Sequence, residues 1–182
     1  MTNEEYLKEY FTNNSDPTKN GYWRPMHLDG EFNDYDVIAS EITADLVVLD
    51  VGCGYHPFKG KIKNLTGIDK YNSAADVVVD LLDFQQDPNF YDVVIALGST
   101  NLHSFDLIEK QIDRLVYWCK PGGRIYMRVN PVLENIISPK MAVYPWTLND
   151  IVYFTNKHNL KIIKPVTLSD NLRLTFTWVK EG

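Results

Sequence analysis

Short apolar runs rich in β-branched residues alternate with polar and glycine-containing segments through the middle of the chain. The runs cover residues 46–51, 65–68, 77–79, 93–97 and 125–129. Continuous apolar runs of this length are typical of strands that are covered on both faces, as in a parallel sheet. The pattern therefore predicts five strands of a mostly parallel sheet.

Two segments show the three-to-four-residue spacing of apolar positions that is typical of an amphipathic helix. The first covers residues 104–119, and Ser104 is placed to cap it. The second covers residues 147–158, where Thr147 and Asp150 approximate the spacing of a capping box. Both segments come after predicted strands, which indicates an alternating arrangement of strands and helices.

The two ends of the chain predict different additions to this core. Shorter helices are expected over residues 3–11 and 34–42, ahead of the first strand. Near the other end, apolar residues at 160–164 and 172–179 predict two strands with a turn between them. An antiparallel hairpin of this kind commonly closes an otherwise parallel sheet.

The length of 182 residues suits a single domain. The hydrophobic fraction of 45% is enough for a substantial buried core. We expect residues 1–45 to form a helical and loop segment that packs on the core, and residues 46–182 to form the main α/β layered domain.

Composition narrows the classes of partner. The formal net charge is -6, and an acidic surface repels phosphate backbones, so general nucleic-acid binding is disfavoured. No apolar run approaches membrane-spanning length, and the polar first residues do not resemble a signal peptide. The two cysteines, Cys53 and Cys119, make neither a disulfide framework nor a zinc site of the usual spacing. These features predict a cytoplasmic protein without a metal and without a membrane anchor.

The strongest chemical signal is the turn that ends the first predicted strand. Asp50 is followed by Gly52, Cys53 and Gly54, and glycines let a ligand approach the backbone closely. Open α/β sheets bind their ligands at this end of the strands. A nicotinamide or flavin site prefers Gly-x-Gly-x-x-Gly, whereas Pro57 occupies the third glycine position here. The turn therefore favours a ligand without phosphates.

Five segments in the expected order resemble the motifs of class I S-adenosylmethionine-dependent methyltransferases. They are residues 47–54, 66–69, 79–84, 91–96 and 119–125, and the similarity covers residues 46–179. The resemblance implies a Rossmann-like, mostly parallel seven-stranded sheet with helices on both faces and a C-terminal antiparallel hairpin. The short interval after the glycine turn resembles the compact members, in which a loop replaces the first helix.

The resemblance also implies roles for acidic residues in holding S-adenosyl-L-methionine. Asp50 is expected near the amino-acid end of the cofactor, Asp69 at both ribose hydroxyls, and Asp80 at the adenine amine with Leu81 beside the ring. Asp83 is the rival of Asp80. Cofactor-binding residues are expected to be Asp50, Gly52, Cys53, Gly54, Asp69, Lys70, Asp80, Leu81 and Gly98. Taken without the motifs, the four aspartates named above are equally compatible with structural roles at a strand end, in a turn or at a helix cap.

The acceptor side carries weaker signals. His103 is a candidate base, although a polar residue that opens a helix is the simpler interpretation. Residues 98–103 lack the Asn/Asp-Pro-Pro-aromatic pattern, which disfavours a DNA-adenine methylase. The long connection over residues 130–146 is expected to form, with the aromatic cluster near residue 23, the walls of an acceptor site. The candidates are Tyr22, Trp23, Arg24, Asn101, Arg128, Asn130, Tyr144 and Trp146, with loop packing as the alternative for the aromatics.

The leading hypothesis is thus a methyltransferase that acts on an unidentified acceptor, either a small molecule or a macromolecule, by direct displacement. The alternative is a non-catalytic protein with the same fold that binds S-adenosylmethionine or S-adenosylhomocysteine, or serves as a scaffold. A Rossmann-type oxidoreductase is disfavoured by Pro57 and by the terminal hairpin.

Overall fold

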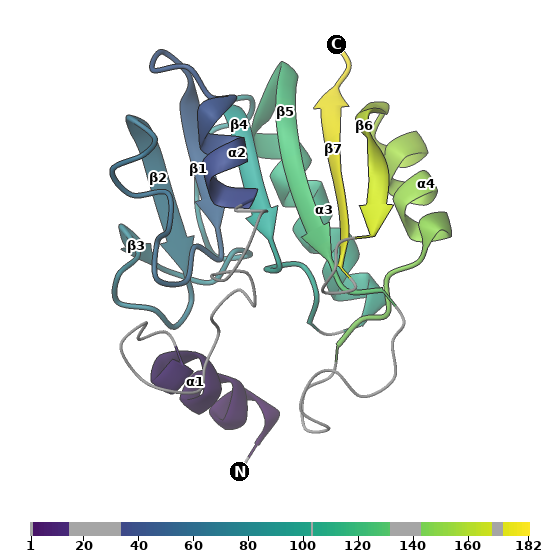
Figure 1. The fold of residues 1–182 in the computed structure, drawn as a ribbon. Helices are drawn as coiled ribbons and strands as arrows, with labels where there is room; N and C mark the ends of the chain where they lie inside the picture. Colours follow the sequence, from purple (N-terminus) through teal and green to yellow (C-terminus); the bar gives the residue numbers. More distant parts are fainter. Residues whose placement is uncertain (1, 15–33, 103, 132–142, 169–172) are drawn as a thin grey trace.

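The computed structural model describes residues 2–14, 34–102, 104–131, 143–168 and 173–182. A seven-stranded sheet in the order β3-β2-β1-β4-β5-β7-β6 forms its centre (Figure 1). The strands are β1 (Val47–Val51), β2 (Asn64–Asp69), β3 (Val77–Val78), β4 (Tyr91–Leu97), β5 (Cys119–Val129), β6 (Leu160–Leu168) and β7 (Leu174–Lys180). Strands β1 to β5 pair in parallel, whereas β7 is antiparallel to both of its neighbours, β5 and β6.

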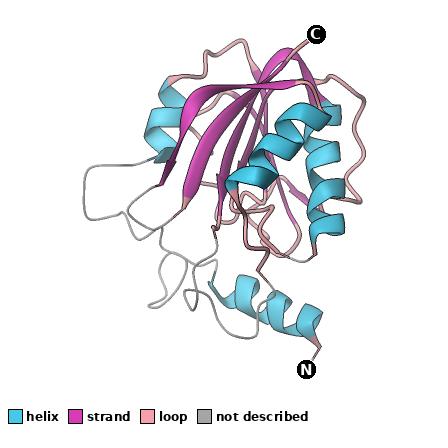
Figure 2. Ribbon diagram, turned by 90° about the vertical axis from the view of Figure 1, so that its right-hand side faces the viewer, coloured by secondary structure: helices cyan, strands magenta, loops and turns pink. Residues whose placement is uncertain are grey.

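Helices cover both faces of this sheet (Figure 2). Helix α2 (Asp34–Ser40) covers one face, α3 (Phe105–Trp118) and α4 (Leu148–Lys157) cover the other, and α1 (Asn3–Asn14) lies below the ends of the parallel strands. On one face, α3 and α4 pack through side chains such as Ile112 and Phe154 against Leu49 and Val94. On the other face, α2 contributes Ile38 to a smaller core. The predicted fold class, with its parallel sheet, two helical layers and terminal hairpin, is confirmed.

A loop without a helix connects β1 to β2, as the resemblance to compact members implied. Phe58 is fully buried and Ile62 nearly so, and both belong to the core on the α2 face. The Phe58 ring meets the Tyr35 ring of α2 edge to face, with centroids 5.2 Å apart. Burial of these two side chains anchors the loop where a helix would otherwise lie.

The caps of the two long helices differ from each other. At α4 the predicted capping box is present, since the Thr147 hydroxyl accepts from the Asp150 amide and the Asp150 carboxylate accepts from the Thr147 amide. At α3, Ser104 occupies the N-cap position, but its side chain makes no cap hydrogen bond. The predicted side-chain cap by Ser104 is therefore wrong.

Two strands also differ from the prediction. Val77 and Val78 of β3 are 40% and 57% exposed rather than covered on both faces, because β3 is a two-residue strand at the edge of the sheet. Strand β5 begins at Cys119 instead of residue 125. Residues 121–123 form an irregularity within β5. The pairing with β4 shifts between Tyr91 and Val93, and Gly122 has a φ of 77°.

Candidate functional site

A cavity opens where the parallel strands end, beside the place at which the chain order reverses. The chain runs outward from β1 to β3 and then returns to β4 beside β1. Open α/β sheets bind ligands at such a switch point. The cavity is lined by the glycine turn (Val51, Gly52, Gly54, Tyr55), residues 68–72, residues 79–81, residues 97–99 with Leu102, Leu7 and Phe11 of α1, and Gln111 of α3. The cavity is partly open to solvent.

The glycine turn fits tightly against the end of β4. The amides of Gly52 and Cys53 both donate to the Ile68 carbonyl, at 2.8 and 3.0 Å, which bends the chain across the end of β2. Gly52 has a φ of 67°, and a Cβ on it would lie 2.5 Å from the Cβ of Ser99. Both backbone conformation and space therefore require glycine at position 52.

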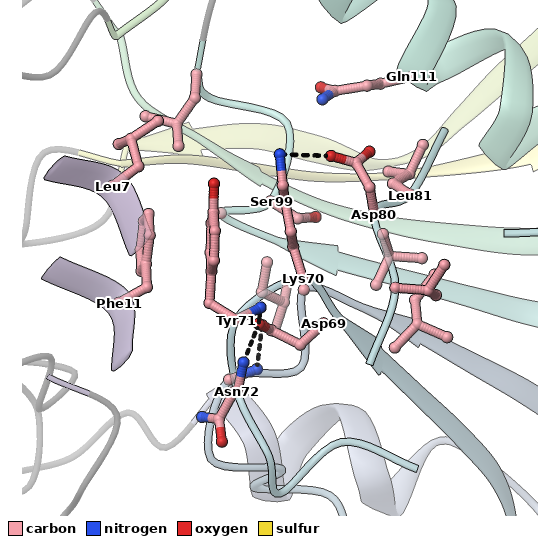
Figure 3. A pocket seen from close by; sticks show the side chains of 18 of the residues that line it. Leu7, Phe11, Asp69, Lys70, Tyr71, Asn72, Asp80, Leu81, Ser99 and Gln111 are labelled. Carbon is pink, nitrogen blue, oxygen red and sulfur yellow. Dashed lines mark hydrogen bonds and ion pairs between the residues drawn. The ribbon is translucent and has the colours of Figure 1, made fainter. Parts of the chain in front are cut away.

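Asp69 ends β2 and organises the two loops that border the cavity (Figure 3). Its Oδ2 accepts from the Gly54 amide at 3.0 Å. Its Oδ1 accepts from the amides of Tyr71 and Asn72, each at 2.8 Å. A carboxylate has about four acceptor positions, so three backbone donors leave about one for a ligand hydroxyl.

Asp80 lines the same cavity and is bridged to α1 by Lys70. Its Oδ1 accepts from the Leu82 amide at 2.9 Å, and its Oδ2 lies 3.1 Å from the Lys70 Nζ. The same ammonium group lies 2.6 Å from Glu4 Oε1, and Figure 3 shows Lys70 reaching past Asp69 toward Asp80. Asp83, the rival of Asp80, is exposed and does not line the cavity. The geometry therefore favours Asp80 over Asp83 as a ligand partner.

Asp50 and Cys53 lie behind the cavity wall rather than in it. Burial, with a smaller contribution from the charge of Asp69, raises the pKa of the Asp50 carboxyl to about 8, and the positive charge of Arg128 opposes this. Asp50 Oδ2 is buried and has no hydrogen-bond partner among the described residues. Burial also raises the pKa of the Cys53 thiol, which is thus protonated and unreactive at neutral pH.

A buried histidine holds the glycine turn to the second strand, and the sequence reading missed it. His56 Nε2 lies 2.8 Å from Asp76 Oδ2, which also accepts from the Gly67 amide at 2.9 Å. A Cβ on Gly67 would lie 2.4 Å from His56 Nε2. A glycine inside a predicted strand often marks such a close approach, so Gly67 was the available signal.

Helix α1 forms one wall of the cavity, which the sequence did not predict. Leu7 is buried and lines the cavity, one turn before Phe11. The Phe11 ring stacks on the Tyr71 ring, with centroids 5.8 Å apart and planes 5° apart, and the Tyr71 hydroxyl donates to Glu4 at 2.9 Å. The spacing of Leu7 and Phe11, one helical turn apart, was the only sign in the sequence.

Four of the candidates for the acceptor side have structural contacts and do not line the cavity. Trp146 is 1% exposed, and its indole N–H donates to the Thr100 carbonyl at 2.8 Å. The Tyr144 hydroxyl donates to Asp150 at 2.8 Å. The Asn101 side chain accepts from the Asn130 amide at 2.8 Å. These contacts are those of residues that tie the loops to the core, which was the alternative interpretation for the aromatics.

The remaining candidates fall into two groups. Arg128 is 5% exposed, and its Nη2 donates to the carbonyl of Leu97, a residue of the cavity wall, at 3.1 Å. His103 and the cluster Tyr22, Trp23 and Arg24 lie outside the described residues. Their predicted roles stay predictions.

No protein-family model and no curated protein sequence matches the chain. Solved structures do match in fold, and they include an N-methyltransferase, NodS, from Bradyrhizobium japonicum in complex with S-adenosylhomocysteine. It aligns over 100% of both chains with a TM-score of 0.68 and 13% identity.

Within the described residues, no helix combines the length and the apolar character that a membrane crossing needs.

Two further neighbours have similar scores. Magnesium protoporphyrin IX methyltransferase from Synechocystis with bound S-adenosylmethionine has a TM-score of 0.70 and 16% identity, over 100% of this chain and 98% of its own. The 1,6-didemethyltoxoflavin-N1-methyltransferase of Burkholderia thailandensis, with 1,6-didemethyltoxoflavin and S-adenosylhomocysteine bound, has a TM-score of 0.71 and 13% identity, over 99% of this chain and 87% of its own. The chain therefore has the class I methyltransferase fold.

Proposed function

We propose that the chain binds S-adenosylmethionine in this cavity and transfers its methyl group to an acceptor. The observation that carries the proposal is the arrangement of Gly52, Asp69 and Asp80 around one cavity at the switch point of the sheet. Each ends or follows a different strand, so a ligand that spans them lies across the ends of β1, β2 and β3. The same ligand is bound in neighbours of this fold.

The residues present fit the cofactor. Asp69 keeps about one acceptor position for a ribose hydroxyl after its three backbone contacts. Asp80 and Leu81 lie together in the cavity wall, where they suit an adenine amine and ring. Asp50 is buried beside the turn with its pKa raised to about 8, so a ligand cation held at the turn would favour its ionised form, and the cofactor carries both an ammonium and a sulfonium group.

When bound, the cofactor would supply a methyl group whose bond to the sulfonium sulfur breaks as its bond to the acceptor forms, with S-adenosylhomocysteine as the leaving group. The residues of this chain then have two tasks, alignment and exclusion of water. The tight approach of Gly52 to Ser99 fixes the turn against β4. Leu7 and Phe11 of α1, with Tyr71, supply the apolar cover of the cavity.

The location of the protein is a further proposal. Both cysteines are buried and free, and free thiols fit a reducing compartment. The net charge of -6 favours a small-molecule acceptor over nucleic acid. We place the protein in the cytoplasm.

Calorimetric titration separates this proposal from a nicotinamide site. S-adenosylhomocysteine is expected to bind more tightly than NAD by on the order of a hundredfold, about 2.7 kcal/mol. The reason is that a loop follows β1, so no helix N-terminus lies after the glycine turn to hold a pyrophosphate. Tighter binding of NAD than of S-adenosylhomocysteine would sink the proposal.

A further inference from the structure

A polar side chain interrupts the apolar face of α3. Gln111 is three residues after Ile108 and four before Leu115, so it projects from the face of the helix that these two residues bury. It is 7% exposed, whereas Ile108 and Leu115 are fully buried. Burying an amide costs free energy unless the amide forms hydrogen bonds, so the fold alone gives no reason for glutamine at this position.

The Gln111 amide lies in the wall of the cavity with its oxygen unpaired. Its Oε1 is buried and accepts no hydrogen bond from the described residues. Buried polar atoms in folded proteins are normally paired. Figure 3 shows the amide turned away from α3 and toward the cavity, which Gln111 lines. The oxygen is therefore available to a ligand in this cavity.

The same part of the wall carries Asp80. Arg114, one turn after Gln111 on α3, donates to the Leu82 carbonyl at 3.5 Å and so ties this helix to the segment after β3. The Asp80 carboxylate accepts from the Leu82 amide and contacts Lys70, which leaves about two acceptor positions for a ligand. Gln111 and Asp80 thus offer acceptor oxygens to one cavity from two different elements.

Two acceptor oxygens in one part of a cavity suit a ligand group that has two hydrogens to donate. The exocyclic amine of adenine is such a group, and it lies next to ring nitrogens that accept. A glutamine amide can bind both, because its oxygen accepts from the amine while its nitrogen donates to a ring nitrogen. Hypoxanthine carries an oxygen in place of the amine, so both protein oxygens would meet an acceptor and stay unpaired.

We propose that Gln111 is a specificity-determining residue of the cofactor site, where its amide and the Asp80 carboxylate together hold the exocyclic amine of adenine. This inference rests on the proposed function and adds to it a second base-reading residue, contributed by α3. An adenosine ligand pairs the Gln111 oxygen, which has no partner among the described residues. An inosine ligand leaves that oxygen unpaired, and the site therefore rejects it.

Calorimetric titrations with S-adenosylhomocysteine and S-inosylhomocysteine test this assignment on the parent protein and on Gln111→Met. Methionine has an unbranched side chain of similar length but no amide. The parent is expected to bind the adenosine ligand at least about a hundredfold more tightly than the inosine ligand. In Gln111→Met the affinity for S-adenosylhomocysteine should fall about tenfold, and the preference between the two ligands should fall by at least about as much.

Thermal unfolding without ligand separates a role in binding from a role in the fold. Gln111→Met removes a buried oxygen that no described residue pairs, so the variant should unfold at or above the temperature of the parent. Gln85→Met is the matched control, because Gln85 is exposed and does not line the cavity. The control should leave both affinities, and hence the preference, unchanged.

Equal binding of the two ligands by the parent would overturn the inference, because the amine is then not read. A Gln111→Met variant that keeps the preference of the parent would also overturn it, whether the two affinities fall together or stay the same. An unfolding temperature well below that of the parent would make Gln111 a structural residue, with the same consequence. In each case the proposed function stands as long as S-adenosylhomocysteine binds to the parent. Failure of S-adenosylhomocysteine itself to bind overturns both.

Discussion

Replacing Gly52 by alanine is expected to lower the affinity for S-adenosylhomocysteine by more than about a hundredfold, close to 3 kcal/mol. The new Cβ would lie 2.5 Å from the Cβ of Ser99, and the residue would have to keep a φ of 67°. Either the turn or the end of β4 has to move, and both line the cavity. The cost in folding stability is smaller, about 1–3 kcal/mol, because the site is at the edge of the core.

Gly60→Ala is the matched control for this substitution. Gly60 has a φ of 82°, but a Cβ there meets nothing within 4 Å. The control therefore isolates the cost of the backbone conformation from that of the clash. Calorimetry gives the affinity and thermal unfolding gives the stability of both variants. A folded Gly52→Ala variant with the dissociation constant of the parent would show that the turn is not part of the ligand site.

Asp69→Ala is expected to weaken the binding of S-adenosylhomocysteine by about 1.5–3 kcal/mol, roughly ten- to a hundredfold, through loss of a hydrogen bond to a charged group. The sequence alone indicated that the fold would be unaffected, since a strand-end carboxylate is not a packing element. The contacts in the structure instead predict that the free energy of unfolding falls by about 1–2 kcal/mol in this variant, because the amides of Gly54, Tyr71 and Asn72 lose their acceptor.

Asp83→Ala serves as the comparison for Asp69→Ala. Asp83 is exposed, and the structure gives its carboxylate no place in the cavity wall. Both affinity and stability should match the parent. Equal affinities of the Asp69→Ala and Asp83→Ala variants would remove Asp69 from the site and leave it a purely structural residue.

Much of the fold could be predicted from the sequence because the deciding signals are local. The apolar run that ends at Val51 and the glycines after it define a strand and a tight turn within eight residues. The capping box of Thr147 and Asp150 is likewise a pattern of four residues. Local patterns were insufficient at β3, where position at the edge of the sheet decides exposure.

The parts of the site that were missed depend on contacts between distant segments. Glu4 of α1 contacts Lys70, and His56 contacts Asp76, and no spacing rule connects either pair. For the same reason the sequence could not decide the role of Trp146, because an aromatic residue at this position suits a binding loop and the core equally well. Its indole N–H finds the Thr100 carbonyl, and the ring is buried.

Transfer of a labelled methyl group from S-adenosylmethionine tests the central claim most directly. The protein is incubated with labelled cofactor and a heat-inactivated cell lysate, and the small-molecule products are separated from the macromolecules by filtration. Label is expected in the small-molecule fraction with the parent protein and in neither fraction with the Gly52→Ala variant. If the parent binds S-adenosylhomocysteine but transfers label to no component of the lysate, small or large, the account of a methyltransferase is contradicted and a non-catalytic cofactor-binding protein takes its place.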